Sequence, residues 1–187
     1  MIERTLVLIK PDGVYRALIG KVLSTFEEAG LKVIGLKMVQ PDEDMAAKHY
    51  IADEEWMKSV GKKTKETYRE KGQELKESEI EIGQRVRNNL LKYLTSGPVA
   101  AIALEGNSAI FVVRKLIGAT EPRKADPSSI RGRYALDSYD MGDTQNRAVR
   151  NIVHASEDEK TAKRELSLWF SDEDLVEYKR VDEGHLY

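Results

Sequence analysis

Short apolar runs alternate with amphipathic stretches along this chain. Residues 5–9 (TLVLI) form a continuous apolar run with β-branched members, which is typical of a buried strand. Longer stretches with apolar residues at helical spacing separate such runs. The expected strands are residues 4–9, 32–40, 99–105 and 150–154. The expected helices are residues 18–29, 43–52, 85–94, 107–117 and 157–170.

The order strand, helix, strand, repeated once, predicts an α+β fold. We expect a ferredoxin-like βαββαβ arrangement with additional helices, in which an antiparallel sheet of four strands has its helices on one face. Two segments interrupt this order. Residues 53–84 are rich in Lys and Glu with little apolar periodicity, which predicts solvated helix or loop, and residues 138–148 precede the last strand. We therefore expect one domain over residues 1–187, with insertions at about 53–84 and 138–148 that project from its core.

Composition narrows the class of protein. A chain of 187 residues with 41% hydrophobic residues is large enough to bury a sizeable core. Its 30 Lys and Arg against 32 Asp and Glu give a net charge of -2, which argues against nucleic acid as the primary partner and against a membrane surface. The absence of cysteine excludes disulfides and thiolate metal sites. We see neither a membrane span nor a signal peptide, so cytoplasm is the expected compartment.

His154 is the strongest candidate for chemistry. It lies between the end of an apolar run (Ile152-Val153) and a predicted helix, for which Ser156 is a suitable N-cap with Glu159 as its capping-box partner. A histidine at that junction has its ring at a sheet edge, close to backbone donors that favour anions. Neutral imidazole is nucleophilic, and only three histidines occur. A lone histidine is more often a structural residue, so this candidate needs support.

Support comes from cations near the ends of other elements. Lys10 follows the first apolar run and precedes the turn sequence Pro-Asp-Gly. Arg114 lies on the polar face of a predicted helix, and Arg131 lies in the long connection 118–150. Taken singly, none of them indicates a site: Lys10 and Arg114 would be read as solvated side chains, and Arg131 as a member of a salt bridge. Together with Thr120 they form a set that suits a polyphosphate, because arginine forks bind phosphate oxygens through paired hydrogen bonds.

With these residues and the segments around them, the chain resembles the nucleoside diphosphate kinase family. The matching segments are ERTLVLIKPDGV, HY, LTSGPV, VVRKLIGATEP, SIRG, NIVHASED and ELSLWF, in the family's order. They cover most of the chain outside the two insertions. KPDG or RG alone would mean little, whereas the histidine motif together with the rest is highly specific.

The resemblance implies a reaction and roles for the matching residues. The γ-phosphate of a nucleoside triphosphate such as ATP would pass to a nucleoside diphosphate by a ping-pong mechanism, with His154 carrying it as pros-phosphohistidine. The phosphates would be bound by Lys10, Arg114, Thr120 and Arg131, with Mg²⁺ bridging phosphate oxygens and no metal ligand assigned to the protein. Lys10 and Asn151 would also bind the sugar hydroxyls, Tyr50 would support Lys10 and the phosphate end, and Ser156 and Glu165 would orient the histidine ring. Only the resemblance supports Glu165. The family also implies the ferredoxin-like fold and a homo-oligomer, commonly a hexamer or tetramer.

The chain departs from the family's pattern in three places. Val86 falls where the family commonly stacks an aromatic residue on the base, and Trp56 or Tyr68 in the first insertion could replace that ring. Arg133 stands where the family often has Asp, which reverses a local charge. After the histidine, Ala155 and Glu157 replace the common Gly and Asp, and both changes are mild.

Two other classes of protein remain open from the sequence. A histidine phosphocarrier in a signalling relay would also need His154, but it has no obvious need for Lys10, Arg114 and Arg131. A ferredoxin-like module that binds RNA would need aromatic residues on its strands. The apolar runs here carry none.

Overall fold

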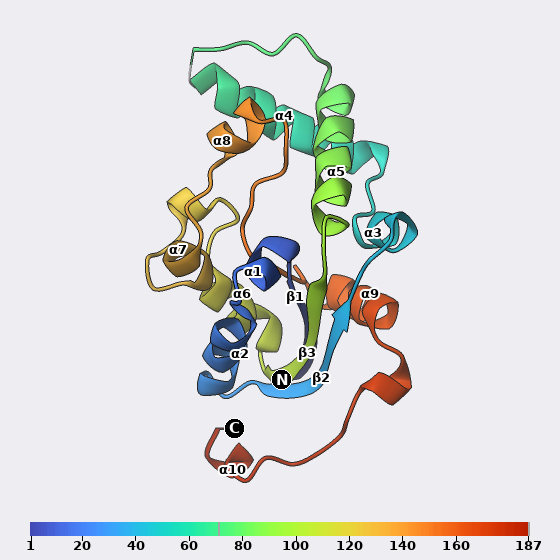
Figure 1. Cartoon of the computed structure of the whole chain (residues 1–187), viewed down its shortest axis with the longest axis vertical. Coiled ribbons are helices and arrows are strands. Elements are labelled where there is room, and N and C mark those ends of the chain that lie inside the picture. The colour runs from blue at the N-terminus through green and yellow to red at the C-terminus, as the bar shows by residue number, and fades with distance from the viewer. Residues whose placement is uncertain (71, 187) are drawn as a thin grey trace.

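The computed structural model describes residues 1–70 and 72–186, and a sheet of four strands lies at its centre. The strands are β1 (Ile2–Ile9), β2 (Lys32–Val39), β3 (Val99–Asn107) and β4 (Val153–Ala155). They lie in the order β2-β3-β1-β4, and every neighbouring pair is antiparallel (Figure 1). This arrangement confirms the expected α+β ferredoxin-like fold.

Helices cover both faces of the sheet, so the expectation of helices on one face was wrong. One face carries α2 (Ile19–Glu28) and α6 (Ala109–Ile117), whose Phe26 and Val113 share a core cluster with Val7 and Ile9 of β1. The other face carries α3 (Glu43–His49), α5 (Glu79–Leu94) and α9 (Glu159–Trp169), which form a second cluster with Leu6 and Leu8. Successive strand residues point to opposite faces, so a strand that is apolar at every position must be buried on both sides.

The remaining elements are short or lie in the two predicted insertions. They are α1 (Pro11–Tyr15), α4 (Glu54–Glu70), η1 (Pro122–Lys124), α7 (Ile130–Tyr134), α8 (Tyr139–Thr144), η2 (Asp172–Asp174) and α10 (Glu183–Leu186). Residues 11–13, expected as a turn, begin helix α1 instead, with Pro11 at a first-turn position that tolerates proline. The helix expected at residues 43–52 ends at His49, and the last strand, expected to begin at residue 150, begins at Val153.

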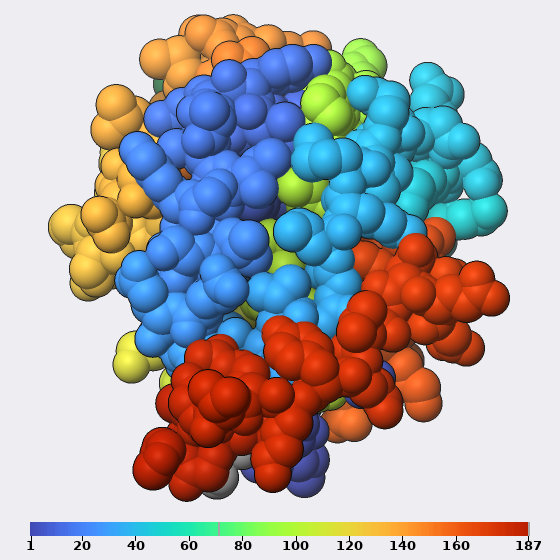
Figure 2. Space-filling model, turned by 60° about the horizontal axis from the view of Figure 1, so that its bottom comes forward, coloured from blue at the N-terminus to red at the C-terminus, as the bar shows by residue number. Residues whose placement is uncertain are grey.

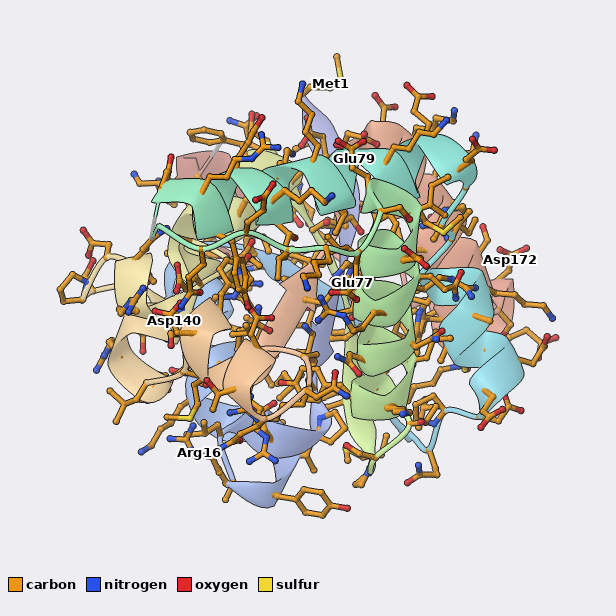
Figure 3. The ribbon with its side chains drawn as sticks, turned by 90° about the horizontal axis from the view of Figure 1, so that it is seen from above. Met1, Arg16, Glu77, Glu79, Asp140 and Asp172 are labelled. Carbon is orange, nitrogen blue, oxygen red and sulfur yellow. The ribbon has the colours of Figure 1, made fainter. Side chains whose placement is uncertain are left out.

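The helix of the first insertion, α4, packs tightly against α5. Figure 3 looks onto α4 where it passes over the beginning of α5, close to Glu79. Two glycines permit this approach: a Cβ on Gly61 would lie 2.0 Å from the Glu79 carbonyl oxygen, and one on Gly83 would lie 2.4 Å from that of Met57. These opposing atoms belong to backbone, so they cannot move aside as a side chain does.

Gly61→Ala is therefore expected to lower the free energy of unfolding by about 1–3 kcal/mol, because overpacking forces backbone shifts. Urea denaturation followed by circular dichroism measures the change. Gly20→Ala on α2 is the matched control, since nothing lies within 4 Å of its Cβ. This control should be neutral or stabilising by up to about 1 kcal/mol, as alanine favours helix. Equal stability of the two variants would contradict the close packing.

The C-terminal segment lies along the free edge of β2, which is an edge strand of the sheet. Figure 2 shows it, in red, over the residues that lead into and form β2. The Val176 amide donates to the Ile34 carbonyl at 2.7 Å, and the Tyr178 hydroxyl donates to the Val33 carbonyl at 3.0 Å. These bonds satisfy part of an edge strand that would otherwise be unpaired.

Across the described residues, no helix has the length and apolarity needed to cross a membrane.

Candidate active site

His154 lies in the middle of β4, opposite Leu8 of β1. Its Nε2 is 3.1 Å and 3.0 Å from the two carboxylate oxygens of Glu165 on α9. A carboxylate only accepts hydrogen bonds, so Nε2 carries the hydrogen and Nδ1 is left with a free lone pair. The His154 side chain is 21% exposed, whereas that of Glu165 is 3% exposed. The ring is thus oriented by a buried group and remains accessible from outside.

Ser156 supports the same carboxylate and does not cap a helix. Its hydroxyl donates to Glu165 Oε2 at 2.7 Å, and both side chains are buried. The N-cap of α9 is Asp158, whose side chain accepts from the Thr161 amide, so the predicted capping box of Ser156 and Glu159 was wrong. Helix α9 begins two residues later than expected, which frees Ser156 to face the site.

The backbone just before His154 has an unusual conformation. Ile152 has a φ of 68°, in the left-handed region that β-branched residues rarely adopt. Its amide donates to Asp12 Oδ2 at 3.2 Å, and its carbonyl accepts from the Lys10 amide at 2.7 Å. Strain of this kind costs about 1–3 kcal/mol and persists where its surroundings fix it. The result joins the start of β4 to the end of β1, so that Lys10 and His154 are held by one framework.

Lys10 is buried at the N-cap position of α1 and points into this framework. Its Nζ donates to Asn151 Oδ1 at 2.8 Å and lies 5.1 Å from the centre of the Tyr93 ring. Burial lowers the pKa of Lys10 to about 7, and repulsion from Arg131 adds to the effect, while Asp12 partly opposes it. A buried amine of this kind has a strong tendency to bind an anion, because a neighbouring negative charge restores its charged form.

Arg131 on α7 holds together the segments around the histidine. Its guanidinium donates to the carbonyls of Gly118 and Val153 at 2.8 Å each, and to that of Asn151 at 3.4 Å. Burial lowers its pKa to about 10; Tyr139 opposes the shift and Arg114 increases it. The influence of Arg114 on this pKa indicates that the two guanidinium groups share one region of the surface. Two cations at such a position, one of them buried, make the region strongly attractive to anions.

The other predicted binding residues surround this region unequally. Asn151 is buried, and its side-chain amide donates to the Thr120 carbonyl at 2.9 Å. This bond holds the loop after α6 against the start of β4. Arg114 and Thr120 have exposed side chains. Val86 is half-buried on α5. The structure thus brings Lys10, Asn151 and Arg131 into direct contact or a shared network, whereas no bond ties Val86 to them in the described parts of the chain.

Tyr50 follows α3 directly, and its ring centre is 6.3 Å from that of His154. Its hydroxyl is buried and has no hydrogen-bond partner among the described residues. Burial raises the pKa of this phenol, with the Glu165 carboxylate adding to the shift. A buried, unpartnered donor beside the histidine is suited to a ligand oxygen.

Sequence reasoning missed the side chains that support these groups. The Tyr93 hydroxyl donates to Asp12 Oδ1 at 2.5 Å and accepts from the backbone amide of Asn151 at 3.2 Å. It therefore links α1, which follows Lys10, to the residues before β4. His49 packs edge-on against His154, with ring centres 4.4 Å apart. Both residues lie on helices distant in sequence from the histidine motif, and only the position of His49 beside Tyr50 could have drawn attention to it.

The family model described as nucleoside diphosphate kinase matches residues 3–60 and 60–175. A nucleoside diphosphate kinase of Pyrobaculum aerophilum is 41% identical over 181 residues, covering 94% of this chain and 99% of that protein. One from Borreliella burgdorferi is 37% identical over 187 residues, covering 100% and 98%.

Solved structures agree. A crystal structure of the Pyrobaculum aerophilum enzyme has a TM-score of 0.90 at 40% identity, covering 95% of this chain and 100% of that one. A transition-state mimic of the Borrelia burgdorferi enzyme, with bound vanadate and ADP, has a TM-score of 0.83 at 38% identity, covering 100% and 97%. These likenesses and the site place the chain among phosphotransferases that act on nucleotides. More specifically, the chain belongs to the nucleoside diphosphate kinase family. Membership decides against both the signalling relay and the RNA-binding module.

Proposed function

We propose that this chain transfers the γ-phosphate of a nucleoside triphosphate to a nucleoside diphosphate, with His154 as the intermediate carrier. The orientation of the histidine carries this proposal: Glu165 holds Nε2 and leaves the lone pair of Nδ1 free. The solved structure of the Borrelia burgdorferi relative, a transition-state mimic with bound vanadate and ADP, supports phosphoryl transfer as the reaction.

The transfer divides into two balanced steps. In the first, the Nδ1 lone pair forms a bond to the γ-phosphorus, the bond to the bridging oxygen breaks, and the diphosphate leaves with that electron pair. In the second, a terminal oxygen of the acceptor diphosphate attacks the same phosphorus, and the N–P bond returns its electrons to Nδ1. The hydrogen on Nε2 stays in place throughout, so Glu165 stabilises the positive charge that develops on the ring.

The cationic groups beside the histidine bind the phosphates. Lys10 and Arg131 contribute buried charge, and Arg114 contributes an exposed guanidinium at the rim. Thr120 donates its hydroxyl, and the unpartnered Tyr50 hydroxyl meets a phosphate oxygen. Lys10 and Asn151 also reach the sugar hydroxyls. Phosphoryl transfer depends mostly on such positioning and charge neutralisation.

Mg²⁺ fits this site through the nucleotide. The carboxylates that contact the site residues are engaged, Asp12 by Tyr93 and the Ile152 amide, and Glu165 by His154 and Ser156. Phosphate oxygens would therefore hold the ion, and it would supply charge neutralisation on the triphosphate. Loss of Mg²⁺ is expected to weaken phosphate binding without disturbing the protein.

The nucleobase lies near Val86 and the two insertions. The insertions contact each other, because the Tyr68 hydroxyl of α4 donates to Asp143 Oδ2 of α8 at 2.8 Å. Tyr139 of α8 is close enough to Arg131 to oppose the lowering of its pKa. Removing residues 56–76 should therefore weaken ATP binding, measured by calorimetry, and native mass spectrometry would show whether the subunit number changes as well. Unaltered affinity and mass would leave the segment as passive surface.

The family supports two further parts of the proposal. The chain forms a homo-oligomer, a hexamer or tetramer, and it acts in the cytoplasm, where nucleoside triphosphates and diphosphates are exchanged. Relatives that bind ADP and, in the Halobacterium salinarum protein, CDP support a site that accepts several nucleosides.

Steady-state kinetics test the proposed reaction. Initial rates with ATP as donor and dGDP as acceptor should give parallel double-reciprocal lines, since the first product leaves before the acceptor binds. Intersecting lines would indicate a ternary complex with direct transfer and would overturn the role of His154 as carrier.

Glu165→Gln should lower the transfer rate by roughly 10²-fold or more. The amide nitrogen can donate to Nε2 and so move the hydrogen to Nδ1, where it blocks the lone pair. Ser156→Ala removes one hydrogen bond to the same carboxylate and should cost about 1 kcal/mol, or roughly fivefold. Rates of phosphoryl uptake from ATP compare the two variants. An effect of Ser156→Ala as large as that of Glu165→Gln would contradict the orienting role of the carboxylate.

A further inference from the structure

His49 is a buried histidine that the proposed reaction leaves without a role. Its ring packs edge-on against three neighbours: His154 at 4.4 Å, Tyr50 at 4.7 Å and Trp169 at 5.7 Å between ring centres. Its Nδ1 is 3.7 Å from Glu165 Oε1. The residue therefore stands beside the one carboxylate that orients the nucleophile.

Trp169 of α9 determines which nitrogen of His49 carries the hydrogen. The indole Nε1 donates to His49 Nδ1 at 3.2 Å, and indole has no acceptor, so Nδ1 must be unprotonated. The hydrogen is then on Nε2, which is buried and has no partner in the described chain. A buried donor without a partner is unfavourable, so this tautomer is held at an energetic cost.

A second proton on His49 would alter the active site. It would have to enter at Nδ1, displace the Trp169 hydrogen bond and place an N–H within reach of Glu165 Oε1. That oxygen already accepts from His154 at 3.1 Å and from Arg164 at 3.5 Å. A charged His49 would then compete with His154 for the carboxylate.

Burial and three neighbouring basic side chains oppose this proton. Burial lowers the pKa of His49 well below 6.5, and electrostatic interactions with His154 of β4, Lys10 at the end of β1 and Arg164 of α9 lower it further. Glu165 is the negative group that faces the ring. The Trp169 hydrogen bond adds to these effects because it stabilises only the form with a free Nδ1 lone pair.

We propose that Trp169 is a positioning residue, whose indole N–H holds His49 Nδ1 as an acceptor and so reserves Glu165 for His154. The proposal rests on the proposed function of His154 and extends it to a second histidine. It explains why a tryptophan is buried with its polar atom directed at an imidazole rather than at backbone.

Trp169→Phe tests this idea, because it removes the donor and keeps an aromatic ring. The measured quantity is the rate of phosphoryl uptake by the chain from Mg-ATP in a single turnover, at pH 5.5 and pH 8. The rate at pH 5.5 divided by the rate at pH 8 should be about tenfold lower in the variant than in the unaltered chain. The reason is that His49 now takes a proton at acid pH and pairs with Glu165. The double variant Trp169→Phe/His49→Gln should recover the original ratio, since it has no group to protonate.

The double variant separates the proposal from a packing defect. Both variants lack the indole, so a merely structural loss would slow uptake by the same factor at both pH values and in both proteins, and that result would overturn the proposal. Nitrogen-15 NMR of labelled histidine in the unaltered chain gives a second readout without any substitution. His49 should show a non-protonated Nδ1 and a protonated Nε2 from pH 5.5 to pH 8; a doubly protonated ring in that range would also overturn it. Uptake of phosphate by the unaltered chain at pH 8 tests the proposed function separately, whatever the tautomer of His49.

Discussion

Replacing His154 by Gln should abolish phosphoryl transfer. We expect a loss of at least about 10⁴-fold in the rate between ATP and a diphosphate, because the amide cannot form the covalent intermediate that divides the reaction. The measurement is a coupled assay of triphosphate formation, paired with calorimetric titration of ADP. ADP binding should persist, since Lys10, Arg114 and Arg131 are unchanged.

Two controls make this result specific. The thermal unfolding temperature of His154→Gln should stay within a few degrees of the unaltered value, because the side chain is partly exposed and not part of either core cluster. His185→Gln, in the exposed α10, should retain full activity. Transfer at a normal rate by His154→Gln would show that another group accepts the phosphate.

Replacing Lys10 by Gln should weaken triphosphate binding and slow transfer, together by about 10²–10³-fold, as expected when one preorganised charge is lost from a phosphoryl-transfer site. Lys21→Gln, an exposed lysine on α2, is the matched control and should have no effect. Calorimetry and single-turnover uptake separate binding from transfer. Identical behaviour of the two variants would remove Lys10 from the site.

Lys10 also makes a pH dependence predictable. The pKa of Lys10 without ligand is about 7, and bound phosphate raises it, because negative charge favours the ammonium form. Affinity should therefore be constant below pH 7 and fall above it, by up to about tenfold per pH unit, until the pKa of the bound state is reached. Calorimetry at pH 8 in buffers of different ionisation enthalpy should detect proton uptake on ATP binding. Affinity that is independent of pH from 7.5 to 9, with no proton uptake, would contradict the low pKa.

Much of the fold could be predicted because the local sequence pattern of each element indicates its type. β1 and β3 are continuous apolar runs, and Gly30 follows the C-cap residue of the helix of residues 19–28. The second layer of helices was not foreseen, since helix periodicity shows that one face is buried but not against which side of a sheet. The capping of α9 was misplaced for a similar reason: Ser156 and Asp158 are both good N-caps, and only the contact with Glu165 separates them.

The site could be predicted in part because its residues lie in specific motifs. His154, Lys10 and Arg131 are recognisable from the segments around them, and the structure places all three around the junction of β1 and β4. The supporting network could not be predicted from the chain's own pattern. Tyr93, His49 and Trp169 appear as ordinary core aromatics until long-range contacts connect them to Asp12, Glu165 and one another. The left-handed backbone at Ile152 is equally invisible, because no local feature of isoleucine favours it.

The most direct test asks whether the chain itself carries phosphate on one imidazole. The protein is incubated with Mg²⁺ and ATP labelled at the γ-phosphate, freed of nucleotide, and digested for mass spectrometry. We predict one labelled site, stable to base and labile to acid, at Nδ1 of His154, and complete discharge of the label to added GDP. A chain that exchanges phosphate between nucleotides without such label, or that carries it elsewhere, would contradict the account.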